Sequence, residues 1–227
     1  MRILAVDTSS ERGSICVSDA SEILGELRLS SSIQHSERVF GSIEFLFRYL
    51  PFQLKDIDLF VAARGPGSFT GLRVGLAAVE GFVAAFGKQG AGVSTLEGVA
   101  WSLGQTTSLI ASTIDARRGE VYGGLYRRIG DELIEEQQPV VLKPAQWFGG
   151  LPREPIVFCG DGAIRYRSLI PSQIGWELRQ GDLYLARALS EIASTTGRGP
   201  LLPLYIRKTD AEIGREQRHE STGSPHT

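Results

Sequence analysis

The residues best placed for chemistry near the start of the chain are Asp7, Thr8 and Ser9, which follow the apolar run 2–6. A polar turn directly after a buried strand can hold a carboxylate against a Mg²⁺-phosphate group, while hydroxyls and backbone N–H groups meet the phosphate oxygens. Asp and Thr also close turns through hydrogen bonds to the nearby backbone. The turn is therefore either a nucleotide-binding loop or a locally capped turn, and the sequence leaves both open.

A second candidate site is the glycine-rich stretch GPGSFTGLRVG over 65–75, between a buried strand and a helix. It is not a Walker-type phosphate loop, because no Gly-Lys-Ser/Thr ends it. In the helix, Gly71 and Gly75 share a face with Ala78 and Phe82. Each glycine inside a helix costs about 1 kcal/mol relative to alanine. That cost indicates that another backbone approaches this face closely, either an internal element or a helix of a partner chain.

Catalytic and metal-binding residues of the common kinds are not predicted. His35 stands alone before the first long helix, and the position one helical turn later is Val39, so no pair of histidines faces a metal. No Gly-x-Ser-x-Gly nucleophile motif occurs, and Ser68 is interpreted as a helix N-cap. The charged turn 115–120 is typical of a solvated hairpin tip, with a partner contact as the alternative.

The composition excludes several classes of protein. The 227 residues carry a net charge of −2 with a pI near 6.0, unlike the basic footprint of a protein that grips nucleic acid alone. Cys16 and Cys159 form no CxxC pair, so we expect two small buried side chains in a reducing compartment. Asp7 interrupts a signal-peptide core, and no uncharged apolar run approaches the roughly 20 residues of a membrane span. These features predict a cytoplasmic protein without a membrane segment.

The elements that must position these residues begin with a meander of strands. Apolar runs and alternation predict strands over 2–6, 14–18, 23–29, 59–63 and 91–93. Helical periodicity predicts three helices, over 36–50, 69–86 and 96–103. The first of these helices carries one apolar stripe, formed by Val39, Phe40, Ile43, Leu46, Phe47 and Leu50. Gly87 ends the second helix.

The second half of the chain repeats this pattern. Strands are expected over 108–114, 120–126, 133–142 and 156–159, and helices over 163–169 and 183–195. In both halves a buried strand ends in an aspartate, turns through charged residues to a glycine and returns as a strand. The duplication predicts an α/β protein with two related lobes facing a cleft. We place the lobes at 1–106 and 107–209, followed by a flexible tail over 210–227.

A series of motifs, in this order, resembles a known family. The motifs are ILAVDTS from position 3, QHSE from 34, ARGPGSFTGLRVG from 63, STLE from 94, DARRGEVY from 115, GDG from 160 and PLYIR from 203. Together they resemble the TsaB-type subunit of the bacterial machinery that makes threonylcarbamoyladenosine in tRNA. The resemblance runs from position 2 to about 212, and the block over 64–75 is its most specific part.

The resemblance implies a fold and a set of partners. The fold is the actin-like fold shared by sugar kinases and heat-shock ATPases. The chemistry belongs to a paralogous catalytic subunit of the TsaD type, which transfers threonylcarbamoyl to the adenosine beside the anticodon in tRNAs reading codons that start with A. A TsaE-type ATPase assists, and tRNA is met through the complex. Such partners hold a metal between two histidines four apart on the first helix. Because Val39 occupies the second position here, we expect a non-catalytic subunit that needs no metal or cofactor, with ATP or ADP at the interface of the complex.

With this resemblance, the partner explanation of the small helix face is favoured over the internal one. We expect the helices over 36–50 and 69–86 to pack against the equivalent pair of the partner in a four-helix interface. The candidate contact residues are His35, Val39, Phe40, Ile43, Gly71, Leu72, Gly75, Ala78, Val79 and Phe82. Periodicity does not distinguish which apolar residues of these helices face inward.

Three other functions compete with this interpretation. The first is an independent ATP-dependent kinase or ATPase of the same superfamily, which would use Asp7 and Thr8. The second is a metallopeptidase, which the missing histidine pair disfavours. The third is a homodimer through the same helix face when the partner is absent, since an exposed apolar helix pair can accept a second copy.

Overall fold

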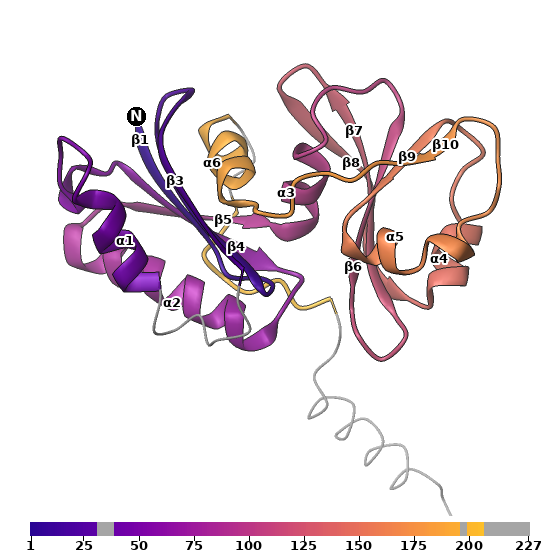
Figure 1. The fold of residues 1–227 in the computed structure, drawn as a ribbon, viewed down its shortest axis with the longest axis horizontal. Coiled ribbons are helices and arrows are strands. Elements are labelled where there is room, and N and C mark those ends of the chain that lie inside the picture. Colours follow the sequence, from indigo (N-terminus) through magenta and orange to yellow (C-terminus); the bar gives the residue numbers. More distant parts are fainter. Residues whose placement is uncertain (31–38, 196–198, 207–227) are drawn as a thin grey trace, which may run out of the picture.

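The chain folds into two five-stranded sheets with helices packed on their faces (Figure 1). The structure is a computed structural model, and it describes residues 1–30, 39–195 and 199–206. His35, the expected start of the first helix and the tail over 210–227 lie outside the described residues. The strands and helices of the described part follow the expected order closely enough to test the duplication directly.

The first sheet is built from a meander followed by two crossover strands. Its strands are β1 (Arg2–Asp7), β2 (Arg12–Asp19), β3 (Glu22–Ser30), β4 (Leu59–Gly65) and β5 (Gln89–Ser94). Their order in the sheet is β3-β2-β1-β4-β5, antiparallel within the meander and parallel across β1, β4 and β5. The turns after β1, β4 and β5 therefore meet at one edge of the sheet, because parallel strands end on the same side.

The second sheet repeats the first in order and direction. Its strands are β6 (Leu109–Asp115), β7 (Val121–Ile129), β8 (Glu132–Leu142), β9 (Ile156–Cys159) and β10 (Trp176–Leu178). They lie in the order β8-β7-β6-β9-β10, with the meander antiparallel and β6, β9 and β10 parallel. The predicted duplication is confirmed. The three-residue β10 was not predicted, because so short a strand carries no periodic signal.

Two helices cover one face of the first sheet. They are α1 (Val39–Phe47) and α2 (Phe69–Phe86), and their buried side chains share a core with Leu4, Phe60 and Ala62. The predicted ends of α2 are confirmed: the Ser68 hydroxyl accepts a hydrogen bond from the Gly71 N–H, and Gly87 adopts the left-handed conformation. Among the described residues α2 is the one helix long and apolar enough to span a membrane, a test that core helices of soluble proteins also pass.

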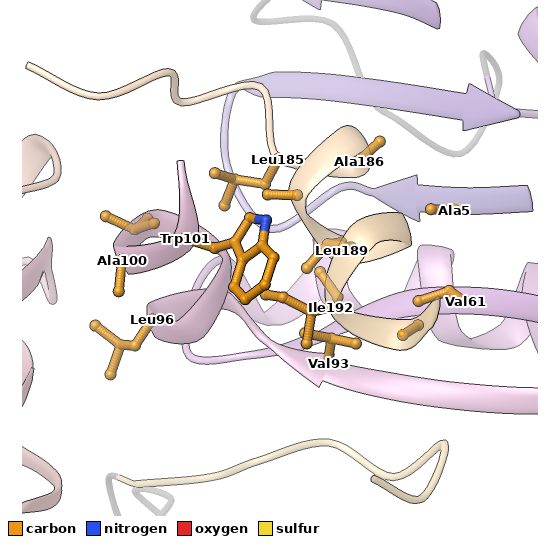
Figure 2. Close-up of a cluster of buried hydrophobic side chains, with 14 of the residues drawn as sticks. Ala5, Val61, Val93, Leu96, Ala100, Trp101, Leu185, Ala186, Leu189 and Ile192 are labelled. Atoms are coloured by element: carbon orange, nitrogen blue, oxygen red, sulfur yellow. The ribbon is translucent and has the colours of Figure 1, made fainter. Parts of the chain in front are cut away.

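The opposite face of the first sheet is covered by helices from both halves of the sequence. These are α3 (Thr95–Trp101) and α6 (Ala186–Ser194), which pack together around Trp101, Leu185 and Leu189 (Figure 2). The same core reaches Ile110 and Tyr126 of the second sheet. One hydrophobic cluster therefore spans both lobes, while each lobe also has a cluster of its own.

We expected the first lobe to consist of residues 1–106 and the second of residues 107–209. The helix α6 belongs to the second of these ranges but packs on the first lobe. Although it follows the second sheet in sequence, α6 packs on β1, β2 and β4 of the first sheet. Ser190 makes a buried 2.8 Å hydrogen bond to Ser18 of β2, and the Ser14 hydroxyl accepts from the Ala186 N–H. The first lobe is thus completed by residues from the end of the chain.

The second sheet carries smaller elements. These are α4 (Pro144–Gly149), α5 (Asp161–Arg165) and a 3₁₀ turn η3 (Arg167–Leu169); a further 3₁₀ turn, η2 (Leu54–Asp56), precedes β4. The helix expected over 163–169 is divided between α5 and η3. The helix α4 was not predicted, although Pro144 stands at its first position, where proline is favoured.

Candidate functional site

The turn after β1 is hydrogen-bonded to its own backbone and to the start of α2. Asp7, Thr8 and Ser9 are all buried. The Asp7 Oδ1 accepts from the Ser9 N–H at 2.9 Å, and the Thr8 hydroxyl donates to the Gly71 carbonyl at 2.7 Å. The Ser68 N–H donates to the Ser9 carbonyl at 2.7 Å. These bonds favour the locally capped turn, because the Thr8 hydroxyl donates to α2 and the Ser9 N–H donates to Asp7 within the turn.

Gly71 and Gly75 make their close approach to Thr8 inside the chain. A Cβ placed on Gly71 would lie 2.0 Å from the Thr8 carbonyl oxygen, and one on Gly75 would lie 2.4 Å from the Thr8 Oγ1. Real Cβ atoms do not come so close to other atoms. The internal explanation therefore accounts for both glycines, and the expectation that they admit a partner helix is corrected.

Most of the other expected contact residues also face inward. Val39 and Ile43 of α1 are buried in the core, and so are three residues of α2, Leu72, Ala78 and Val79. A partner on the surface cannot reach Val39, Leu72, Ala78 or Val79, whereas Ile43 lines an apolar groove between α1 and α2. Of the expected set within the described residues, Phe40 is exposed and Phe82 is half-buried. His35 lies outside the described residues.

Phe40 and Phe82 form the rim of an apolar groove between α1 and α2. The groove has a volume of about 370 Å³. The Phe40 ring is 55% exposed and meets Phe82 edge to face, with the ring centroids 5.9 Å apart. The residues lining the groove are Phe40, Ile43, Glu44, Phe47, Arg48, Leu54 and Phe82. Such a groove beside exposed aromatic rings is typical of a surface that binds another protein.

The outward face of α2 continues from this groove and is formed largely of small residues. Ala77, Gly81 and Ala84 are exposed and follow one another at steps of four and three along the helix. A Cβ on Gly81 would meet nothing within 4 Å. This face can therefore take a neighbouring helix at short distance. Sequence reasoning missed this face, because the stripe of Ala77 and Gly81 is as small as the stripe of Gly71 and Gly75, and only the structure shows which of the two is buried.

The charged turn of the second lobe lies at the junction with the first. Arg117 and Arg118 adopt positive φ values of 61° and 54°, and the Arg117 N–H bonds the Asp115 carboxylate at 3.0 Å. Arg117 also reaches Glu11 across the lobes at 3.6 Å, but both side chains are largely in water, so this pair contributes little. Burial raises the pKa of the neighbouring Asp161, and its Oδ1 accepts from the Asp115 N–H.

No metal centre is assembled by the part of the chain that the structure describes. Within it, no group of three or more His, Cys, Asp or Glu side chains lies close enough together to hold an ion. The two cysteines are free thiols and both are buried, as expected. The candidate site that remains is therefore a surface, formed by the groove and the outward face of α2.

Comparisons with known proteins point in one direction. The model of the family described as TsaD, tRNA N6-adenosine threonylcarbamoyltransferase, matches residues 24–175. The chain is 28% identical to the tRNA threonylcarbamoyladenosine biosynthesis protein TsaB of Bacillus subtilis, covering 93% of this chain and 96% of that protein. It is 32% identical to the protein of the same name from Haemophilus influenzae, covering 91% and 94%.

Solved structures agree with the sequence relatives. YeaZ from Pseudomonas aeruginosa superposes with a TM-score of 0.77 at 26% identity, covering 90% of this chain and 99% of that one. The ethanolamine utilization protein EutJ from Carboxydothermus hydrogenoformans superposes with a TM-score of 0.50 at 13% identity, covering 86% and 89%, which shows a shared fold alone. With the duplicated sheets, these matches confirm the expected actin-like fold.

Proposed function

Because the chain belongs to the TsaB family of tRNA threonylcarbamoyladenosine biosynthesis proteins, related to the transferase TsaD, we propose that it is a non-catalytic subunit that binds and activates a paralogous threonylcarbamoyltransferase. The partner modifies the adenosine beside the anticodon in tRNAs that read codons starting with A. The chain acts in the cytoplasm, requires no cofactor of its own, and meets tRNA and an ATPase subunit through the complex.

The observation that carries the proposal is the exposed surface over α1 and α2. Phe40 stands in water at the apolar groove of about 370 Å³, while the exposed Phe45 and Tyr49 form a separate pair of rings on α1 and in the turn after it. An exposed aromatic ring at the mouth of an apolar groove is typical of a surface that binds another protein. Next to the groove, the outward face of α2 carries only small side chains at Ala77 and Gly81, so another helix can pack against it at short distance. A partner that covers both would bury the apolar rings.

The relationship between the two subunits supports the choice of partner. The transferase family model matches a segment of this chain that includes both α1 and α2. A paralogue should therefore carry an equivalent helix pair, and two such pairs can meet about an approximate two-fold axis, as in a symmetric dimer. At 18 residues, α2 is about 27 Å long, enough to serve as the spine of such an interface.

The same argument predicts how the interface differs from the one expected from sequence. The partner should pack on Phe40, Phe82 and the outward residues of α2, and not on Gly71 and Gly75. Activation would follow from ordering of the partner's active site when its own helices are held. The weak homodimer available to an isolated chain uses the same surface, since this surface is what a paralogue would match.

The test places a bulky side chain on the outward face of α2. Gly81→Leu adds volume where the chain itself has open space within 4 Å, so the fold should be unaffected. We expect its affinity for the purified paralogous subunit, measured by calorimetry, to fall by about tenfold or more. The matched control is Gly149→Leu, which makes the same change at an equally open glycine in α4 of the second lobe.

Two results would overturn the proposal. Equal affinities for Gly81→Leu, Gly149→Leu and the wild type would exclude the outward face of α2 from the interface. Magnesium-dependent ATP turnover, or transfer of threonylcarbamoyl to tRNA, by the purified chain alone would exclude the non-catalytic role. The turnover measurement also tests the alternative of an independent ATPase.

A further inference from the structure

The segment 199–206 follows α6 in sequence and is hydrogen-bonded to β5 and β4 of the first sheet; we call it the C-terminal strap. Gly199 and Gly92 of β5 exchange two backbone hydrogen bonds, both 2.9 Å. The Leu204 N–H donates to the Arg64 carbonyl at the end of β4, at 2.7 Å. The strap then passes the N-terminal end of α2 (Figure 1). Its course is thus set by main-chain bonds to β4 and β5.

The strap brings Tyr205 onto the first residue of α2. The ring centroids of Tyr205 and Phe69 are 5.9 Å apart, and the two rings are 48% and 49% exposed. The guanidinium of Arg73, one helical turn along α2, stacks on the Phe69 ring at 3.8 Å from the ring centroid. We call Phe69, Arg73 and Tyr205 the aromatic–arginine cluster. It is held together by contacts between its own members, although about half of each ring is in water.

The cluster lies in line with the surface proposed for the partner. Phe69, Arg73, Ala77 and Gly81 follow one another at steps of four along α2, and all four are exposed. The cluster therefore forms the N-terminal end of the outward face, and the groove at Phe40 and Phe82 lies toward the other end. Tyrosine, phenylalanine and arginine are the residues that protein interfaces favour, and rings already fixed in place lose little entropy on binding.

We propose that the C-terminal strap is part of the partner-binding surface, with Tyr205, Phe69 and Arg73 contacting the paralogous subunit at the N-terminal end of α2. This inference rests on the proposed function. It gives a role to the PLYIR motif over 203–207, whose described residues lie on the strap. It also makes the interface composite, because α2 from the first half of the sequence and the strap that follows α6 contribute to it together.

The charge of α2 favours a protein over RNA as the occupant. Arg73 is the one cation among the residues of α2, and Glu80 is its one anion. RNA binding draws most of its affinity from a series of basic side chains that meet phosphates. The small residues that continue the cluster suit a packed helix, since a base would need aromatic or basic groups to stack on.

The test compares three alanine variants for affinity to the purified paralogous subunit. Tyr205→Ala and Phe69→Ala should each weaken binding about tenfold, and the double variant should lose less than the product of the two, because the rings act as one contact. Tyr205→Phe keeps the ring and should bind like the wild type. Ile174→Ala is the control, as Ile174 is a fully exposed apolar residue of the second lobe. Thermal unfolding of each variant checks that the fold is intact.

The outcomes separate this inference from the function on which it rests. If Gly81→Leu weakens the heterodimer while Tyr205→Ala and Phe69→Ala, both folded, bind like the wild type, the strap is outside the interface and the inference is overturned. If Gly81→Leu also binds normally, the proposed function fails with it. If Tyr205→Ala reduces direct binding of tRNA to the chain but leaves subunit affinity unchanged, the cluster is an RNA contact and the inference is again overturned.

Discussion

Three glycines on one helix should respond in opposite directions to the same substitution. In Gly71→Ala the new Cβ lies 2.0 Å from the Thr8 carbonyl oxygen, and in Gly75→Ala it lies 2.4 Å from the Thr8 Oγ1. In Gly81→Ala it meets nothing within 4 Å. All three substitutions raise the helix propensity by a similar amount. Differences in stability among the three variants therefore measure the space beside each glycine.

The expected magnitudes follow from packing and propensity. Alanine at Gly81 should stabilise the fold by roughly 0.5–1 kcal/mol, the usual difference between the two residues in a helix. At Gly75 the Thr8 side chain must move and lose its bond to the Gly71 carbonyl, so we expect a net loss of about 1–3 kcal/mol. At Gly71 the obstacle is a backbone carbonyl, which cannot swing aside, and the loss should be about 3 kcal/mol. Gly71→Ala and Gly81→Ala should thus differ by about 4 kcal/mol.

The assay is urea unfolding followed by tryptophan fluorescence, with thermal unfolding as a second measure. For a chain of this length each kcal/mol shifts the Tm by about 2–4 °C, so Gly71→Ala should melt about 6–12 °C below the wild type. The reasoning is refuted if Gly71→Ala and Gly75→Ala are as stable as Gly81→Ala. In that case α2 does not pack on the turn after β1, and the two glycines would again be available to a partner helix.

Three further measurements test buried groups. Burial raises the pKa of Glu97, so ionisation of this carboxyl opposes folding, and the free energy of unfolding should fall as pH rises from about 4.3 through the raised pKa. Glu97→Gln should remove that fall, which urea unfolding at about pH 4–8 measures. A difference in stability between Glu97→Gln and the wild type that becomes smaller as pH rises would contradict this. Burial, with nearby carboxylates, raises the pKa of Cys16 to about 12 and burial raises that of Cys159 as well, so mass spectrometry should find neither thiol alkylated at pH 8 until urea unfolds the chain; alkylation of the folded protein would contradict this. Ser190→Ala leaves the Ser18 hydroxyl buried without its bond and should cost about 1–3 kcal/mol, part of which the added Ser18→Ala restores; strictly additive losses would argue against the bond.

Local signals in the sequence were sufficient for most elements of the fold. The ends of α2 were predictable because Ser68 and Gly87 are residues that start and stop helices for definite stereochemical reasons. The duplication was predictable because Asp7 and Asp115 end equivalent strands before equivalent turns. Each of these signals lies within a few residues of the structure that it specifies.

The direction of the helix faces was not predictable in the same way. The stripe containing Gly71 and Gly75 and the stripe containing Ala77 and Gly81 are both small, and periodicity assigns neither to the interior. The stripe of Gly71 and Gly75 is buried because Thr8, which is far away in sequence, fills the space beside these two glycines. The site residues that were wrong as surface contacts, such as Leu72, are the ones that this long-range packing turns inward.

The placement of α6 has a consequence for how the protein is made. On the ribosome the strands β1, β2 and β4 emerge early, but α6, which covers one of their faces, is synthesised only after all the strands of the second sheet. Until then α3 alone covers part of that apolar face, and the part over β1 and β2 lacks its covering helix. We therefore expect no stable nascent first lobe, a dependence on chaperones during synthesis, and a single cooperative folding step once the second lobe has been translated. A chain truncated before α6 should be degraded, however complete its first sheet is in sequence.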